Sequence, residues 1–334
     1  MKKIAIVGAG SWGTALAVVL GRARREHRLA LWGHSADVVA TLRSRRVNEI
    51  YLPGFTLPPE VEITGNLSEA LRGAEIVLGV MPSAYSRELY RAVRPHLETG
   101  ATVVSATKGL EPATHARASE VIAAELGPNA SHRIAVLAGP SFAREVARGD
   151  PTAAVIASSN SETAAAIQEE FSGSTLRLYT NDDVVGTELA GAVKNVIAIA
   201  VGVCVGLGLG ANTVAALVTR GLAEMTRLAV ALGGRRETLA GLAGVGDLVL
   251  TCTGELSRNR SVGVELGKGR RIEEILASMR MVAEGVGTAA ATLELARRAG
   301  VELPITQQMN AVLTLGVSPR DAVRELMDRR LRQE

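Results

Sequence analysis

The chain has 334 residues, of which 47% are hydrophobic, 21% charged and 3% aromatic, and its formal net charge is +3. This composition is typical of a globular protein and excludes a disordered chain, and the length favours two domains. Basic residues are spread along the chain and aromatic residues are few, so we expect no nucleic-acid partner. Two distant cysteines, Cys204 and Cys252, exclude a disulfide framework and favour a cytoplasmic protein.

In the first half of the chain, short apolar runs alternate with longer segments of mixed character. This is the pattern of βαβ units around a parallel sheet. Helical periodicity is expected over residues 84–97 and 116–126. The expected strands are residues 4–7, 29–32, 76–80, 102–106, 134–138 and 153–157. We therefore predict an α/β fold whose first domain, residues 1–180, is a Rossmann-like, doubly wound and mostly parallel sheet.

The second half, residues 181–334, is predicted to be all helical. Asn181, Asp182 and Asp183 are suited to cap a helix, and long periodic segments of Ala, Leu, Gly and Met follow them. Residues 195–219 carry no charge and are long enough to span a bilayer. Small and turn-forming residues divide this stretch: Gly202, Gly206, Gly208, Gly210 and Asn212. We therefore expect two buried helices packed closely through small residues, and no membrane span.

A glycine motif follows the first expected strand. Gly8, Gly10 and Gly13 form GxGxxG between the strand at 4–7 and a helix-prone segment at 14–20. One glycine permits the tight turn, the next lets a pyrophosphate approach the backbone, and the third lets helix and strand pack closely. The context predicts a dinucleotide-binding turn, although the spacing alone also occurs in ordinary glycine turns.

The end of the second expected strand bears on the choice of dinucleotide. NAD-preferring folds usually place an acidic residue there to bind the ribose 2′-hydroxyl, whereas this chain has Gly33 and His34. Without that carboxylate a 2′-phosphate is not repelled, so we expect NADP to be used at least as well as NAD. His34 is either a contact of the adenosine end or an exposed loop residue.

Hydride transfer from an alcohol also needs a group that takes the hydroxyl proton. All five histidines precede residue 133, and no cluster of Cys, His and acidic residues has metal-binding spacing, so we expect no metal. Lys194 is the only lysine between Gly109 and Gly267 and lies in the apolar segment LAGAVKNVIAIA. Burial would lower its pKa and make it a base. The alternative is a structural lysine that either extends its amine to the surface or pairs with a carboxylate such as Glu188.

A second polar segment, GVGDLVLTCTGELSRNRS, lies further along. Asp247 stands in a glycine-flanked turn, and residues 257–261 combine two arginines with hydroxyl and amide donors that suit a phosphate or carboxylate. The alternative is a solvated loop. Residues 107–109 and 139–141 follow two expected strands, and therefore lie at the ligand-binding edge of a doubly wound sheet. We expect the site between the two halves.

Six segments, GAGSWGTALA, ATKGLE, AGPSFAREVA, AGAVKNVIAIAVG, LAGVGDLVLTCTGELSRNR and VAEG, together resemble the bacterial NAD(P)-dependent sn-glycerol-3-phosphate dehydrogenase family. The resemblance runs over essentially the whole chain in the same order. It implies the reversible reduction of dihydroxyacetone phosphate to sn-glycerol 3-phosphate, a phospholipid precursor, in the cytoplasm.

By matching motif, the resemblance implies that Lys194 is the proton acceptor when the alcohol is oxidised. It implies cofactor contacts at the glycine turn and at Ser11, Trp12, His34, Lys108, Ala143, Arg258, Val282 and Glu284. It implies substrate contacts at Lys108, Gly139, Ser141, Lys194, Asp247, Ser257, Arg258 and Asn259.

Two other functions are also compatible with these sequence features. A β-hydroxyacid dehydrogenase has a similar two-domain plan and also uses a lysine, but its substrate is a carboxylate; the arginines of the SRNR segment favour phosphate. A non-catalytic dinucleotide sensor would keep the glycine turn and have no need of Lys194 or Asp247. A homodimer is the expected assembly, because such dimers are the commonest soluble oligomers.

Overall fold

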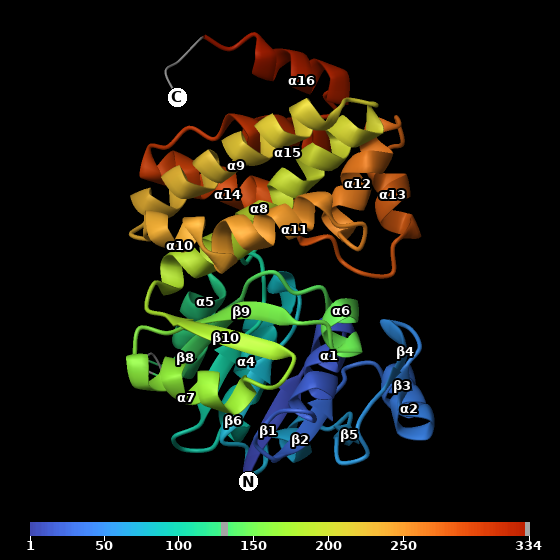
Figure 1. Ribbon diagram of the computed structural model, residues 1–334, viewed down its shortest axis with the longest axis vertical. Coiled ribbons are helices and arrows are strands. Elements are labelled where there is room, and N and C mark those ends of the chain that lie inside the picture. Colours follow the sequence, from blue (N-terminus) through green and yellow to red (C-terminus); the bar gives the residue numbers. More distant parts are fainter. Residues whose placement is uncertain (128–132, 331–334) are drawn as a thin grey trace.

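The structure is a computed structural model that describes residues 1–127 and 133–330. A sheet flanked by helices forms one half of the molecule and a bundle of helices forms the other (Figure 1). The predicted α/β fold with a helical second half is confirmed.

The sheet of the described residues has eight strands in the order β10-β9-β8-β7-β6-β1-β2-β5. Neighbouring strands are parallel except for β8 and β9, which are antiparallel. The strands are β1 (Lys2–Val7), β2 (His27–Trp32), β5 (Glu62–Thr64), β6 (Ile76–Gly79), β7 (Thr102–Ser105), β8 (Ile134–Ala138), β9 (Thr152–Ala157) and β10 (Leu176–Asn181). A separate antiparallel pair is formed by β3 (Val47–Asn48) and β4 (Leu52–Thr56).

The predicted strands all form, and the sequence prediction missed four others. Central strands such as β1 and β6 are covered on both faces, so they are continuous apolar runs and easy to find. The edge strand β10 alternates buried and exposed residues, and its sequence LRLYTN has no such run. The three-residue β5 and the pair β3 and β4 are too short to show any period. β10 extends to Asn181, one residue beyond the limit predicted for the first half.

Helices cover both faces of the sheet. They are α1 (Ser11–Leu20), α2 (Ala36–Arg45), α3 (Leu67–Leu71), α4 (Ser86–Val93), α5 (Ala118–Leu126), α6 (Ala143–Arg148) and α7 (Ser161–Phe171). The helix expected over 84–97 is shorter than predicted: 3₁₀ turns at Ser83–Tyr85 and Arg94–His96 flank α4. Pro95 accounts for the end of α4, because proline has no backbone N–H to continue the helical hydrogen bonds.

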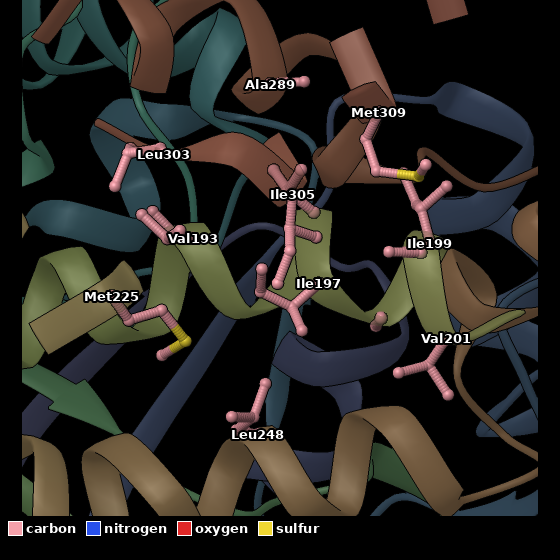
Figure 2. Packing of buried hydrophobic residues seen from close by; sticks show 14 of the residues in the cluster. Val193, Ile197, Ile199, Val201, Met225, Leu248, Ala289, Leu303, Ile305 and Met309 are labelled. Carbon is pink, nitrogen blue, oxygen red and sulfur yellow. The ribbon is translucent and has the colours of Figure 1, made fainter. Parts of the chain in front are cut away.

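The second half is built around α8 (Val184–Gly206), which Asp183 caps through a hydrogen bond from Gly186 N. Figure 2 shows Val193, Ile197 and Ile199 of α8 among side chains from the surrounding helices. Those helices are α9 (Ala211–Ala231), α10 (Arg236–Ala240), α11 (Asp247–Thr253), α12 (Arg258–Gly267), α13 (Ile272–Ser278), α14 (Glu284–Ala299), α15 (Pro304–Thr314) and α16 (Pro319–Met327).

Glycines let α8 and α12 approach closely. A Cβ atom on Gly202 would lie 2.1 Å from the carbonyl oxygen of Arg260, and one on Gly206 would lie 2.2 Å from that of Val264. The prediction of helices packed through small residues is therefore confirmed for α8. It is wrong for the start of α9, whose first ten residues are exposed or half-buried. The chain also continues as helix through Gly202 and turns only after Gly206.

α8 is the one helix, among the described residues, that is long and apolar enough to cross a membrane. In the structure, 89% of its most apolar window is buried inside the protein. A mostly buried helix of this kind is the core helix of its half, so its length and composition alone are weak evidence for a membrane span.

Candidate active site

The glycine turn joins β1 to α1, and its three glycines meet different surroundings. Gly8 has φ +128°, and a Cβ there would lie 2.1 Å from the carbonyl oxygen of Val80. A Cβ on Gly13 would lie 1.8 Å from the carbonyl oxygen of Gly8. A Cβ on Gly10 would meet nothing within 4 Å. Two glycines are thus required by the protein's own packing, and the third leaves open space at the start of α1.

Other predicted cofactor contacts surround this turn. Ser11 is the first residue of α1, and Trp12 packs in a small apolar cluster with Ala143 of α6 and with Phe55. At the carboxyl end of β2, Gly33 is buried and His34 is exposed, with its ring centroid 6.0 Å from that of Trp32.

Two lysines share one buried carboxylate where the sheet meets the helices. Asp247 is only 1% exposed. Its Oδ1 accepts a hydrogen bond of 2.6 Å from Lys194 Nζ, and its Oδ2 accepts one of 3.0 Å from Lys108 Nζ. Lys194 also donates to Thr251 Oγ1 at 2.7 Å, and that hydroxyl donates to the carbonyl of Asp247 at 2.6 Å. The sequence predicts a glycine-flanked turn at Asp247, and this is wrong: Asp247 is the first residue of α11. A π-helical turn, Leu242–Gly246, precedes it.

Burial controls the protonation of Lys194. The side chain is 5% exposed, and loss of water lowers its pKa to about 8. The carboxylate of Asp247 opposes this shift, and the positive charge of Lys108 adds to it. Lys194 does pair with a carboxylate, but the partner is Asp247 and not Glu188, which accepts hydrogen bonds from Arg117 and Ser119.

Lys108 connects this cluster to the loop that follows β8. Its Nζ donates to the carbonyl of Gly139 at 2.8 Å and to Ser141 Oγ at 3.2 Å. Gly139 has φ +114°, a left-handed conformation that glycine adopts readily. Lys108 and Gly139 follow β7 and β8, which are parallel neighbours, so their residues meet at one edge of the sheet. The structure therefore brings together the predicted contacts Lys108, Gly139, Ser141, Lys194 and Asp247.

The SRNR segment, which starts at Ser257, forms the cap and the first residues of α12. Ser257 caps the helix by accepting a hydrogen bond from Arg260 N, and Asn259 donates from Nδ2 to Asn195 Oδ1 at 2.8 Å. Ser257 and Asn259 are both buried, so the alternative of a solvated loop is wrong for them. Arg258 lies exposed on the first turn and donates to the carbonyl of Val282 at 2.8 Å.

The start of α14 contacts the sheet edge. Glu284 accepts hydrogen bonds from Ser83 N at 3.1 Å and from Ser83 Oγ at 2.6 Å. A Cβ on Gly109 would lie 2.6 Å from Glu284 Oε2, so the bare backbone there leaves room for the carboxylate. Burial raises the pKa of Glu284, and the bonds from Ser83 oppose that shift.

Three residues of this site were absent from the predicted contacts: Ser83, Asn195 and Thr251. Thr251 lies four residues after Asp247, and that spacing on a helix is the signal that could have identified it. Nothing in the sequence near Ser83 points to Glu284, which lies 201 residues away. We call Lys108, Lys194 and Asp247 the lysine cluster. Within the part of the chain that the structure describes, no hydrogen bond joins His34 or Trp12 to this cluster. Among the same described residues, no group of three His, Cys, Asp or Glu side chains is placed to hold a metal.

Family models and named relatives match this chain over nearly its whole length. The family model described as NAD-dependent glycerol-3-phosphate dehydrogenase N-terminus matches residues 3–164, and the corresponding C-terminus model matches residues 183–324. A protein of Koribacter versatilis named glycerol-3-phosphate dehydrogenase [NAD(P)+] is 58% identical over 98% of both chains. One of the same name from Acidobacterium capsulatum is 55% identical over 100% of both.

A solved structure gives the same result. The crystal structure of glycerol-3-phosphate dehydrogenase from Coxiella burnetii has a TM-score of 0.92 and 41% sequence identity, and the match covers 98% of this chain and 99% of that one. The two family models together span most of the sequence, and the glycine turn and lysine cluster lie inside the matched ranges. The chain therefore belongs to the NAD-dependent glycerol-3-phosphate dehydrogenase family.

Proposed function

We propose that this chain interconverts dihydroxyacetone phosphate and sn-glycerol 3-phosphate by hydride transfer, with NADP or NAD as cofactor. The observation that carries the proposal is the buried Asp247 carboxylate that holds Lys194 and Lys108 at the carboxyl edge of the sheet. That edge is where doubly wound folds bind their ligands. The relatives named above carry this activity in their names.

The residues present fit a dinucleotide. The open space at Gly10 and the start of α1 would take the pyrophosphate, with Ser11 and Trp12 beside it. His34 would lie at the adenosine end, and Ala143, Arg258, Val282 and Glu284 would contact the remainder. When bound, the nicotinamide supplies the hydride for reduction or takes it in oxidation.

Lys194 would move the proton. In reduction its ammonium gives a proton to the oxygen that was the carbonyl oxygen, and in oxidation its neutral amine takes the hydroxyl proton back. A pKa of about 8 leaves both forms accessible near neutral pH. Asp247 and Thr251 fix the direction of the amine by two hydrogen bonds, so the remaining position on nitrogen can face the substrate.

The phosphate end of the substrate would be held by cations and amides of both halves. Arg258 and Asn259 lie on the first turn of α12 and Ser257 caps that turn, where helix N–H groups favour an anion. Lys108 and Ser141 would bind from the sheet side, next to the carbonyl of Gly139. Lys108 from the sheet half and Arg258 from the helical half would thus each supply a positive charge for the phosphate.

A turnover assay tests the proposal. NADPH and NADH oxidation is followed with dihydroxyacetone phosphate as the acceptor, and the reduction of NADP⁺ and NAD⁺ by short 3-hydroxy acids is followed in parallel. We expect turnover with the phosphate substrate only. Turnover with the acids alone would favour a β-hydroxyacid dehydrogenase, and cofactor binding without any turnover would favour a dinucleotide sensor.

We infer further that the enzyme acts as a homodimer in the cytoplasm and supplies glycerol 3-phosphate for phospholipid synthesis. Two buried, unpaired cysteines, Cys204 and Cys252, suit a reducing compartment. We place the domain boundary at residues 181/182, one residue after the predicted 180/181, because β10 ends at Asn181 and Asp183 caps α8. Light scattering of the purified protein tests the dimer, since a monomer mass would contradict it.

A further inference from the structure

Two buried asparagines form a continuous line of hydrogen bonds through the site. The backbone N–H of Gly285 donates to Asn259 Oδ1 at 3.0 Å, and Asn259 Nδ2 donates to Asn195 Oδ1 at 2.8 Å. Asn195 Nδ2 then donates to the carbonyl of Lys108 at 3.1 Å and to that of Gly191 at 3.2 Å. We call Gly285, Asn259, Asn195 and the Lys108 carbonyl the amide relay.

The amide relay has a fixed direction. Every donor points from α14 toward the loop after β7, and each carboxamide uses its oxygen as acceptor and its nitrogen as donor. Rotating the Asn195 amide by half a turn would direct its oxygen at the Lys108 and Gly191 carbonyls. Asn195 is 5% exposed and Asn259 is 8% exposed, so water cannot easily replace a lost partner. The orientation of each amide therefore depends on the next.

The two ends of the amide relay lie at different ligands of the proposed reaction. Gly285 directly follows Glu284, a proposed cofactor contact whose carboxylate is held by Ser83. At the other end, the Lys108 side chain reaches Asp247 and Ser141 on the proposed substrate side. The aliphatic part of Lys108 also lies against α8, 3.8 Å from where a Cβ on Gly191 would be. Order at the start of α14 is thus connected to the placement of Lys108.

We propose that Asn195 is a positioning residue that couples cofactor binding to substrate binding through the amide relay. The proposal rests on the proposed function, because it takes the cofactor to contact residues 282–284 and the substrate to contact Lys108. A cofactor that orders the start of α14 holds the Gly285 N–H in place, and the two amides then hold the loop that carries Lys108. Such coupling is reciprocal, so the substrate must tighten cofactor binding by the same factor.

The coupling can be measured without turnover, because NADPH and sn-glycerol 3-phosphate are both reduced. The Kd of NADPH is measured by fluorescence with and without saturating sn-glycerol 3-phosphate. We expect the wild-type protein to bind NADPH about fivefold or more tightly with the second ligand present.

Two variants break the amide relay in different ways. Asn195→Asp keeps the shape but places an oxygen against the Lys108 and Gly191 carbonyls, and Asn195→Ala removes both bonds without adding charge. In both we expect the coupling factor to fall to about 1 and KM for dihydroxyacetone phosphate to rise about tenfold. The Kd of NADPH alone should stay within about twofold, which also shows that each variant is folded. Asn66→Asp is the matched control, because Asn66 is an exposed cap of α3 and aspartate caps equally well.

The outcomes separate the two proposals. A wild-type protein that reduces dihydroxyacetone phosphate but shows no coupling, or coupling that survives in both Asn195 variants, overturns the amide relay and leaves the proposed function intact. A wild-type protein that neither reduces dihydroxyacetone phosphate nor binds sn-glycerol 3-phosphate overturns the proposed function and the assignment of the amide relay with it.

Discussion

The glycine turn and the lysine cluster are both parts of one candidate active site, yet they are built by opposite means. At the glycine turn, the site depends on side chains that are missing: Gly8 and Gly13 have no room for a Cβ, and Gly10 leaves space open. At the lysine cluster, the site depends on charged side chains, with the buried Asp247 between the buried Lys194 and the half-buried Lys108.

The difference decides which functional information each region carries. The backbone of the turn suits any dinucleotide, and many unrelated activities use it. The buried charges are specific to a reaction, because burying a lysine next to a carboxylate is unfavourable unless the pair is well hydrogen-bonded. Each region therefore predicts a different response to substitution.

The largest effect is expected from Lys194→Ala. Loss of the proposed proton donor should lower kcat for reduction of dihydroxyacetone phosphate by about 10²-fold or more, with the Kd of NADPH little changed. Steady-state kinetics and a fluorescence titration measure the two quantities. Lys268→Ala, which removes an exposed lysine of a surface ion pair, is the control. Unchanged turnover in Lys194→Ala would remove the role proposed for this residue.

The turn should respond in two different ways. In Gly13→Ala the Cβ collides with the carbonyl of Gly8, so we expect a loss of about 1–3 kcal/mol in the free energy of unfolding. Gly10→Ala should unfold at the wild-type temperature but bind NADPH about tenfold more weakly, because its Cβ fills the space left for the pyrophosphate. Thermal melting and NADPH titration of both variants test this. Equal melting temperatures for the two would contradict the assignment of separate roles.

The pH dependence tests the electrostatics of the cluster. Oxidation of sn-glycerol 3-phosphate needs neutral Lys194, so its kcat should rise about tenfold per pH unit below pH 8 and level off above. Reduction needs the ammonium, so its kcat should be level below pH 8 and fall above. Rate profiles from pH 6 to 10 in both directions measure this. Profiles that bend in the same sense in both directions would exclude Lys194 as the titrating group.

The smallest effect is expected at His34. A carboxylate in His34→Asp should repel the 2′-phosphate, and at this exposed position about 1 kcal/mol, or about fivefold in kcat/KM for NADPH, is expected. The neutral variant His34→Asn is the control, and NADH kinetics should change little in either. The wild type should use NADPH at least as well as NADH, so a hundredfold preference for NADH would show that Gly33 and His34 do not set the choice.

More of the glycine turn than of the lysine cluster could be predicted from the sequence. Gly8, Gly10 and Gly13 were identified from spacing alone, because the turn is local and each glycine has a backbone reason. Lys194 was found as an isolated charge in an apolar helix, but its partner was not: Glu188 lies six residues away in the chain, and Asp247 lies 53 away. The missed strand β10 and the hydroxyl of Ser83 likewise depend on tertiary neighbours that no local pattern shows.

The length of the first half of α8 sets the direction in which Lys194 points. The helix is capped by Asp183 next to the sheet, and Lys194 comes eleven residues later, roughly three turns and about 17 Å along a buried rod. Removing a single residue between these two positions would rotate Lys194 by about 100° and turn it away from Asp247. The first half of α8 must therefore keep its length, whereas the turn at Leu207–Gly210 lies beyond the lysine and can gain or lose residues without moving it.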